Sequence, residues 1–247
     1  MLRGLGRNIK HWLGFDKFAA RHFRTISIDA RGLGKSTRDM SPLDTIYDLA
    51  DDVVRVMDAV GIDKSHVLGV SLGGMVSMAM GLKHPARTSS LVIINSSIAG
   101  SGHPRLTLPA WLLLLRAVAL GPAIYDDLAR LLLGPEASVD LRKKVARDWL
   151  KIDQSMKVSP ALIVKQILAA ARFRVRGDLS AIKAPTLVMY GKGDQFVPHA
   201  NSELIAKLIP RARMVGIEGA GHELTIDRPD EALEEIRKFI KWSEARK

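Results

Sequence analysis

The segment SHVLGVSLGGMVSMAMGLK, residues 65–83, changes its pattern halfway along. Its first six residues form an apolar, β-rich run that predicts a strand, and residues 72–83 predict a helix that ends near Pro85. The turn between them reads Gly69-Val70-Ser71-Leu72-Gly73. Small residues on both sides allow a tight, strained turn, which would raise the Ser71 hydroxyl above the strand end, beside the free N–H groups of the helix. This context predicts a nucleophilic serine. The alternative is an ordinary strand–turn–helix connection without a catalytic role, in which the glycines only allow the tight turn.

A serine hydroxyl needs a base to become a nucleophile, and the base needs a carboxylate to orient it. His222 follows a predicted strand at 212–217 and precedes the closing helix, 229–242. Asp194 follows a predicted buried strand at 185–191. Both lie in loops at the C-terminal ends of parallel strands, where open α/β sheets bind their ligands. The sequence therefore predicts Ser71, Asp194 and His222 as a catalytic triad.

Other acidic residues fit this role less well. Asp178 and Asp227 flank predicted helix starts and are interpreted as helix caps. The predicted strand 90–95 runs into Asn95-Ser96-Ser97, which offers no acid.

Strands and helices alternate on both sides of a block of helices, residues 98–180, that is punctuated by prolines. This order predicts an α/β fold: a mostly parallel sheet with helices on both faces, and a helical cap inserted into it. We expect residues 1–97 and 181–247 to form the core and 98–180 the cap. The other predicted helices are 9–23, 43–60 and 200–208, and the other predicted strand is 24–30.

The chain has 247 residues, of which 47% are hydrophobic, and it contains no cysteine. This composition suits one large domain and excludes a disordered chain. Without cysteine there is no disulfide framework or thiolate metal site, which fits a reducing compartment and predicts a cytoplasmic location. Pro109 and Arg116 interrupt the longest apolar candidate, 106–120, so no run reaches the roughly 18–20 residues that span a bilayer. We expect no stable membrane insertion.

The formal net charge is +11, from 37 basic and 26 acidic residues. The excess lies in residues 1–50, with 9 basic and 5 acidic side chains, and in residues 101–180, with 13 and 7. These charges are scattered singly apart from Arg142-Lys143-Lys144, and an aromatic content of 5% is too low for a base-stacking surface. The pattern indicates a solvated basic surface and no nucleic-acid partner.

With the triad in the order Ser, Asp, His, the chain resembles the α/β-hydrolase superfamily. DARGLGKS, residues 29–36, looks like the family's D-x-R-G-x-G-x-S turn. RGLG, residues 3–6, looks like its H-G-x-G loop, with Arg3 in place of histidine. The resemblance covers essentially the whole chain and implies an oxyanion hole made by the backbone N–H groups of Leu5 and Leu72.

The resemblance also implies three strands before this loop, the third of them in the middle of the sheet. Only Met1 and Leu2 precede Arg3. We therefore expect the N-terminal strands to be missing, with a largely unfilled central position flanked by unpaired strand edges. An incomplete N-terminus would also leave export open.

The resulting prediction is a serine hydrolase (a carboxylic ester hydrolase) that cleaves an ester, lactone or thioester through an acyl-enzyme, without a metal or cofactor. Its partner would be a small ester-like molecule; the oligomeric state is open. The leucine-rich segment 106–133 is either cap packing or an apolar wall for an acyl or alkyl chain. Trp111, Tyr125 and Val197 are the candidate substrate-binding residues, and an acyl ester is favoured over a charged substrate.

Four other functions remain alternatives. Cofactor-free haloperoxidases and C–C bond hydrolases share the same triad. A non-catalytic binding module of this fold is a different class, which the missing strands favour and the complete triad disfavours. A nucleotide-binding P-loop is suggested by GKST, residues 34–37, but Asp29 stands where its first glycine should be and no helix follows directly.

Overall fold

The computed structural model describes residues 1–120 and 124–245, and a parallel sheet of four strands lies at its centre. The strands lie side by side in chain order: β1 (Ser65–Val70), β2 (Thr88–Ile94), β3 (Thr186–Gly191) and β4 (Ala212–Ile217). Each neighbouring pair is parallel, so all four strands end at the same edge of the sheet. The predicted α/β architecture is confirmed.

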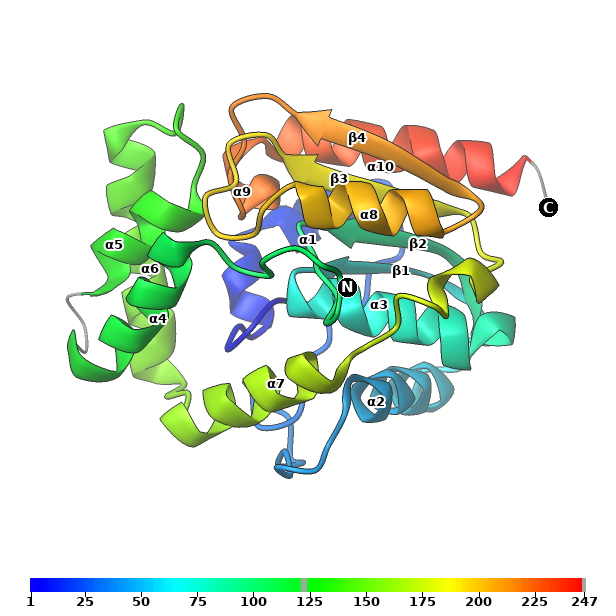
Figure 1. Cartoon of the computed structure of the whole chain (residues 1–247), viewed down its shortest axis with the longest axis horizontal. Helices are drawn as coiled ribbons and strands as arrows, with labels where there is room; N and C mark the ends of the chain where they lie inside the picture. Colours follow the sequence, from blue (N-terminus) through cyan, green and yellow to red (C-terminus); the bar gives the residue numbers. More distant parts are fainter. Residues whose placement is uncertain (121–123, 246–247) are drawn as a thin grey trace.

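Helices cover both faces of the sheet (Figure 1). Alternate strand residues enter two separate cores: Leu91 and Ile93 pack on one face, and Val92 and Ile94 on the other. Both faces are buried, which explains why β2 is almost continuously apolar. The first face carries α2 (Ile46–Ala59), α3 (Leu72–Lys83) and α8 (Ala200–Leu208), and the second α1 (Phe15–Ala19), the short α9 (Leu224–Asp227) and α10 (Pro229–Glu244).

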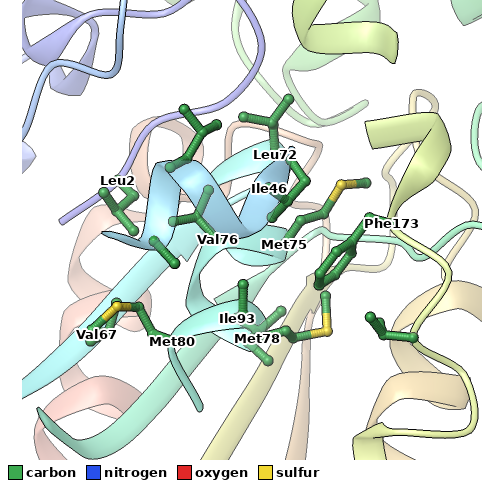
Figure 2. Packing of buried hydrophobic residues seen from close by; sticks show 14 of the residues in the cluster. Leu2, Ile46, Val67, Leu72, Met75, Val76, Met78, Met80, Ile93 and Phe173 are labelled. Atoms are coloured by element: carbon green, nitrogen blue, oxygen red, sulfur yellow. The ribbon is translucent and has the colours of Figure 1, made fainter. Parts of the chain in front are cut away.

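Helix α3 is buried along almost its whole length, because it lies between the sheet and α2. Figure 2 shows Met75, Met78 and Met80 of α3 in this cluster, with Ile93 of β2 and Phe173 beside them. Methionine side chains are flexible enough to fill the irregular gaps of such a layer. The start of α3, which follows Ser71, is therefore fixed by packing on all sides.

The helical block forms α4 (Leu108–Leu120), α5 (Ile124–Leu132), α6 (Val139–Ser155) and α7 (Pro160–Arg172). Helices α4 to α6 gather at one end of the molecule around the buried Trp149, and α7 extends from them toward α2 (Figure 1). The buried side chains of α7, such as Leu162 and Ala169, belong to the core of the sheet. No helix of the described residues is both long and apolar enough to cross a bilayer.

The single helix predicted over 9–23 is wrong. A short 3-10 helix, η1 (Ile9–Trp12), is separated from α1 by Leu13 and Gly14, whose φ angles are 48° and 97°. The break lets Leu13 pack toward α4 to α6 while Trp12 and Phe15 pack on α10. The predicted strand 24–30 is reduced to one isolated bridge, at Ile28.

Leu2 lies next to β1, in the central position of the sheet where a strand is expected to be missing. It forms parallel bridges with both Ile28 and Gly69; its N–H donates to the Leu68 carbonyl at 2.8 Å. Beside the preceding part of β1, a cavity of about 640 Å³ opens between residues 24–28 and the strand. Apolar side chains of α2 and α10 line its two sides. Among the described residues, Leu2 alone pairs with β1 on this side.

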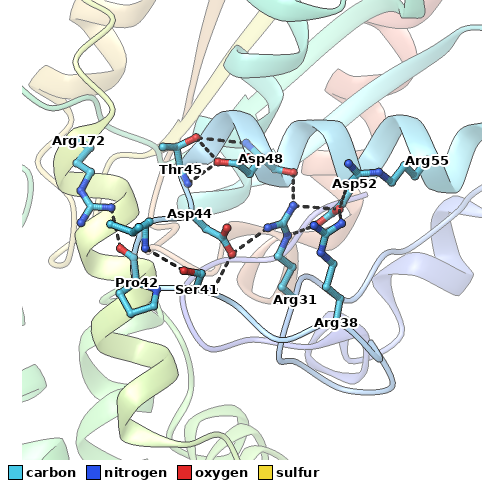
Figure 3. Close-up of polar contacts among 11 residues, drawn as sticks. Arg31, Arg38, Ser41, Pro42, Asp44, Thr45, Asp48, Asp52, Arg55 and Arg172 are labelled. Atoms are coloured by element: carbon cyan, nitrogen blue, oxygen red, sulfur yellow. Dashed lines mark hydrogen bonds and ion pairs between the residues drawn. The ribbon is translucent and has the colours of Figure 1, made fainter.

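The turn at 29–36 is held by buried charge. Asp29 accepts the N–H of Ile9 at 2.7 Å and that of Lys35 at 3.0 Å. Arg31, which is 4% exposed, contacts the carboxylates of Asp44 at 2.8 Å and Asp52 (Figure 3). The contacts of Arg31 fix the loop before α2 against the first turns of that helix. The bond from Ile9 N–H to Asp29 attaches residues 3–9 to the same turn.

Gly73 gives a test of the packing at the start of α3. A Cβ atom there would lie 2.4 Å from the Leu2 carbonyl oxygen and 2.8 Å from that of Arg3. Because backbone atoms cannot yield, we expect Gly73→Ala to lower the free energy of unfolding by about 1–3 kcal/mol in urea titrations, although alanine favours helices. The control is Gly177→Ala, where no atom lies within 4 Å. Equal effects of the two substitutions would contradict the close contact.

Candidate active site

Ser71 sits at the turn from β1 into α3 in a conformation that few non-glycine residues adopt, with φ 56° and ψ −117°. The turn is possible because Gly69 has no side chain: a Cβ there would lie 2.0 Å from the Gly73 carbonyl oxygen. The Ser96 hydroxyl, from the loop after β2, donates to the Ser71 carbonyl at 2.8 Å. Strain of this kind persists only where surrounding structure enforces it, and it is typical of active sites.

Asp194 and His222 form a buried pair. Nδ1 of His222 lies 2.9 Å from Oδ2 of Asp194, and the two side chains are 5% and 2% exposed. The other oxygen, Oδ1, accepts the N–H groups of Phe196 at 2.7 Å and Val197 at 2.9 Å. These bonds fix the position of the carboxylate. Because Nδ1 faces Asp194, Nε2 is the nitrogen that can exchange a proton with a substrate or with Ser71.

Ser71 is partly exposed and lines a cavity with Leu5, Leu72, Trp111 and Val197. Phe196 also lines this cavity, and its ring lies 4.8 Å from the His222 ring. Among the described residues, the Ser71 hydroxyl has no hydrogen-bond partner, His222 included. In serine hydrolases without substrate, the distance between the serine hydroxyl and the histidine is often too long for a hydrogen bond, and it shortens when substrate binds.

Two residues that line the same cavity, Leu5 and Leu72, have backbone N–H groups for which the described part of the chain offers no acceptor. Leu72 is the first residue of α3, so its N–H has no partner within the helix. The neighbouring loop passes close to the serine: a Cβ on Gly4 would lie 3.1 Å from Ser71 Cβ. Gly6 N–H donates to Gln166 at 2.8 Å, whereas the N–H of Leu5 has no acceptor in the described part of the chain. Paired free donors beside a nucleophile can stabilise an oxyanion.

A family model described as alpha/beta hydrolase fold matches residues 1–229. The chain belongs to this family. Two curated relatives bear the name "Putative carbamate hydrolase RutD": that of Azorhizobium caulinodans is 31% identical over 92% of this chain and 84% of its own, and that of Caulobacter sp. strain K31 is 28% identical over 96% and 88%. The solved enol-lactonase of Burkholderia xenovorans LB400 shares the fold, with 24% identity, a TM-score of 0.79 and coverage of 97% and 90%.

Asn95 is a residue of this α/β hydrolase that sequence reasoning missed. Its amide nitrogen donates to the carbonyls of Gly221 at 3.0 Å and His222 at 2.8 Å, and its oxygen accepts the Gly191 N–H at 3.0 Å. It thus joins the end of β2 to the end of β3 and to the histidine loop. A buried asparagine directly after a strand was the available signal, because such an amide must find partners.

Arg3, which replaces the usual histidine of the family, forms a buried ion pair with Glu223. One guanidinium nitrogen lies 2.7 Å and 2.6 Å from the two carboxylate oxygens, and the side chains are 1% and 4% exposed. Burial alone would raise the pKa of Glu223, but the charges of Arg3 and Arg7 lower it below its ordinary value. Since Glu223 follows His222 directly, the Arg3–Glu223 pair joins the loop of residues 3–6 to the loop that carries His222.

Asp227 ties the histidine loop to the end of α5. The helix-cap interpretation of this residue is wrong: one carboxylate oxygen accepts the N–H of Gly221 at 2.6 Å and that of Gly134 at 2.7 Å. Burial, the largest influence, raises the pKa of Asp227 to about 6. The group holds two loops together as a hydrogen-bond acceptor.

Tyr125 does not line the Ser71 cavity. Its hydroxyl donates to Asp153 at 2.7 Å, which keeps its side chain in the contact between α5 and α6. Arg7 lies nearby with its guanidinium 4.1 Å from the centre of the Trp149 ring. In the described ranges, no group of three or more His, Asp or Glu side chains is arranged to hold a metal ion.

The Arg3–Glu223 pair predicts a non-additive effect on stability. Arg3→Met leaves a buried carboxylate without its main partner, so we expect a loss of about 3–5 kcal/mol in the free energy of unfolding. The double variant Arg3→Met/Glu223→Leu removes both charges and should regain much of that loss. Urea titrations of the two single variants and the double variant measure the coupling. Additive losses would show that the pair contributes no specific interaction.

Asp227 predicts a pH dependence of stability. Because its pKa is raised from 3.8 to about 6, the folded state binds the proton more tightly than the unfolded state. Its contribution to stability is therefore greatest below about pH 4 and falls as the pH rises to about 6, by roughly 2–3 kcal/mol. Asp227→Asn does not titrate, so its stability relative to the wild type should rise over this window in urea titrations at pH 4 to 7. A difference that stays constant with pH would contradict the buried carboxyl.

Proposed function

We propose that this protein is a serine hydrolase that cleaves a carboxylic ester, lactone or thioester through an acyl-enzyme. The observation that carries the proposal is the buried Asp194–His222 hydrogen bond of 2.9 Å, beside a cavity lined by a strained serine. The two free N–H groups at that cavity support it further. Each component of acyl transfer has a candidate residue: nucleophile, base, orienting carboxylate and oxyanion donors.

The geometry supports the following sequence of steps. Ser71 Oγ attacks the carbonyl carbon while His222 Nε2 removes its proton, and the N–H groups of Leu5 and Leu72 stabilise the oxyanion. His222 then gives the proton to the departing alcohol or thiol as the acyl–oxygen or acyl–sulfur bond breaks. A water molecule, deprotonated by His222, attacks the acyl-enzyme and releases the acid and free Ser71. Asp194 keeps His222 in the required tautomer throughout.

Carbamate hydrolysis is the second candidate, and the names of the two relatives at 28% and 31% identity favour it. A carbamate is also an acyl carbon with a leaving group, so Ser71, His222 and Asp194 would act in the same order. The site geometry is common to both substrates. A parallel assay of a simple ester and the matched carbamate would rank the two.

The triad assignment predicts graded losses of activity. Ser71→Ala should abolish the pre-steady-state burst of p-nitrophenolate from p-nitrophenyl acetate. Asp194→Asn should lower kcat by about 10⁴-fold with little change in KM, because the wrong histidine tautomer is then favoured. Stopped-flow and steady-state absorbance measure both effects.

The matched control is Ser180→Ala, an exposed serine whose hydroxyl bonds only to the Gly177 carbonyl. It should keep the wild-type burst and turnover. Full activity of Ser71→Ala would refute the proposal. If the wild type neither turns over esters or carbamates nor reacts with a fluorophosphonate, the result would favour a binding module of this fold.

A further inference from the structure

Arg105 is the one charged residue among those that line the Ser71 cavity in the described part of the chain. It lies in the segment between β2 and α4, and its side chain is half-buried. Its companions in the lining are mostly apolar, among them Leu106, Trp111 and Leu114. An arginine in such surroundings loses hydration, which is costly unless an anion or acceptor replaces the water.

Within residues 1–120 and 124–245, Arg105 has no hydrogen bond and no ion pair. Three other half-buried or buried arginines have polar partners: Arg3 binds Glu223, Arg31 binds Asp44, and Arg142 donates to the Gly134 carbonyl. A fourth, Arg7, instead lies with its guanidinium 4.1 Å from the centre of the Trp149 ring. Burial lowers the pKa of Arg105, and the nearby charge of Arg174 lowers it further. Both influences disfavour the cation, and no carboxylate of the described residues offsets them. A bound anionic ligand would offset both influences.

A second cation stands beside the first. Arg174 is exposed, and its guanidinium has no ion-pair partner among the described residues. The two segments are joined, because Ala99 N–H donates to the Phe173 carbonyl at 3.0 Å. Arg176, on the same segment as Arg174, donates to the Ser101 carbonyl at 3.2 Å and does not line the cavity. We call Arg105, Arg174 and Arg176 the basic rim. They lie within residues 101–180, a range that contains 13 basic and 7 acidic side chains.

We propose that Arg105, supported by Arg174, is an anion subsite of the Ser71 cavity, so that the substrate carries a carboxylate at the end of a short apolar chain. The inference rests on the serine-hydrolase function proposed above and names its substrate class. A guanidinium can bind both oxygens of a carboxylate at once, and the apolar lining accommodates the chain between the carboxylate and the reacting carbonyl. This replaces the expectation of an uncharged acyl ester.

The test compares esters that differ only in the terminal group. Monoethyl succinate, glutarate and adipate carry a carboxylate, and ethyl butyrate, pentanoate and hexanoate carry a methyl group in its place. Three chain lengths are used because the distance between Arg105 and Ser71 determines which ester can reach both residues at once. Hydrolysis is followed by pH-stat at fixed ionic strength, because exposed charges are screened by salt. We expect the wild type to prefer the anionic ester of at least one chain length.

Arg105→Gln should lower kcat/KM for the preferred anionic ester on the order of 10- to 100-fold and change that for its methyl partner less than about threefold. The matched control is Arg176→Gln, which removes the same charge from the same rim without touching the cavity. It should preserve the anionic preference. Equal losses for both esters in Arg105→Gln, or equal losses of preference in the two variants, would overturn the subsite.

A binding measurement separates this inference from the proposed function. Ser71→Ala cannot form an acyl-enzyme, so its affinity for each anionic ester and its methyl partner is measurable by NMR titration. The subsite predicts tighter binding of the anion in at least one pair, and loss of that advantage in Ser71→Ala/Arg105→Gln. Equal binding within all three pairs overturns the subsite even if the wild type is an active esterase. Anion-selective binding without any turnover by the wild type would retain the subsite and refute the serine hydrolase.

Discussion

The backbone strain at Ser71 is the constraint on which the rest of the site depends. With φ at 56°, the residue holds its position only because glycines at 69 and 73 allow β1, α3 and the Leu2–Arg3 backbone to approach within distances that exclude a Cβ. Helix α3 cannot relax away, since it is buried between the sheet and α2. The same turn makes Leu72 the first residue of α3, which leaves its N–H free. One packing arrangement thus fixes both the proposed nucleophile and one of the two proposed oxyanion donors.

The position of His222 depends on a different kind of interaction, a buried polar network. The histidine loop is held by Asn95 from β2, by Asp227 from α9 and, through Glu223, by Arg3. In a low-dielectric interior each of these groups is costly when unpaired, so the network is stable only when it is complete. The position of His222 therefore depends on Arg3, whose partner Glu223 is 220 positions away from it in the chain. Arg3 in place of histidine fits this scheme, because it brings a permanent charge that can neutralise a buried carboxylate.

Much of this arrangement was predictable, and the reasons are local. Apolar, β-rich runs predicted the strands, and apolar residues at a spacing of three to four predicted most helices. The rule that parallel strands end at one edge predicted that Asp194 and His222 lie together, as they do, and it predicts Ser71 at the same edge. The failures involve pairings between distant segments. Nothing near Asp227 shows that its carboxylate reaches Gly134, and nothing near Arg3 shows its partner. The helix predicted over 9–23 failed because Leu13 and Trp12 pack on different cores, a choice that hydrophobic periodicity does not record.

Helices α4 and α5 are bonded to the two loops that carry Asp194 and His222. At the start of α4, Thr107 N–H donates to the Phe196 carbonyl, in the loop that carries Asp194. At the end of α5, the Leu132 carbonyl accepts the Glu223 N–H, and Gly134 lies so close that a Cβ there would meet the Gly219 carbonyl at 1.9 Å. The start of α4 is thus bonded to the loop that carries Asp194, and the end of α5 to the loop that carries His222, so the positions of both side chains depend on the helical block.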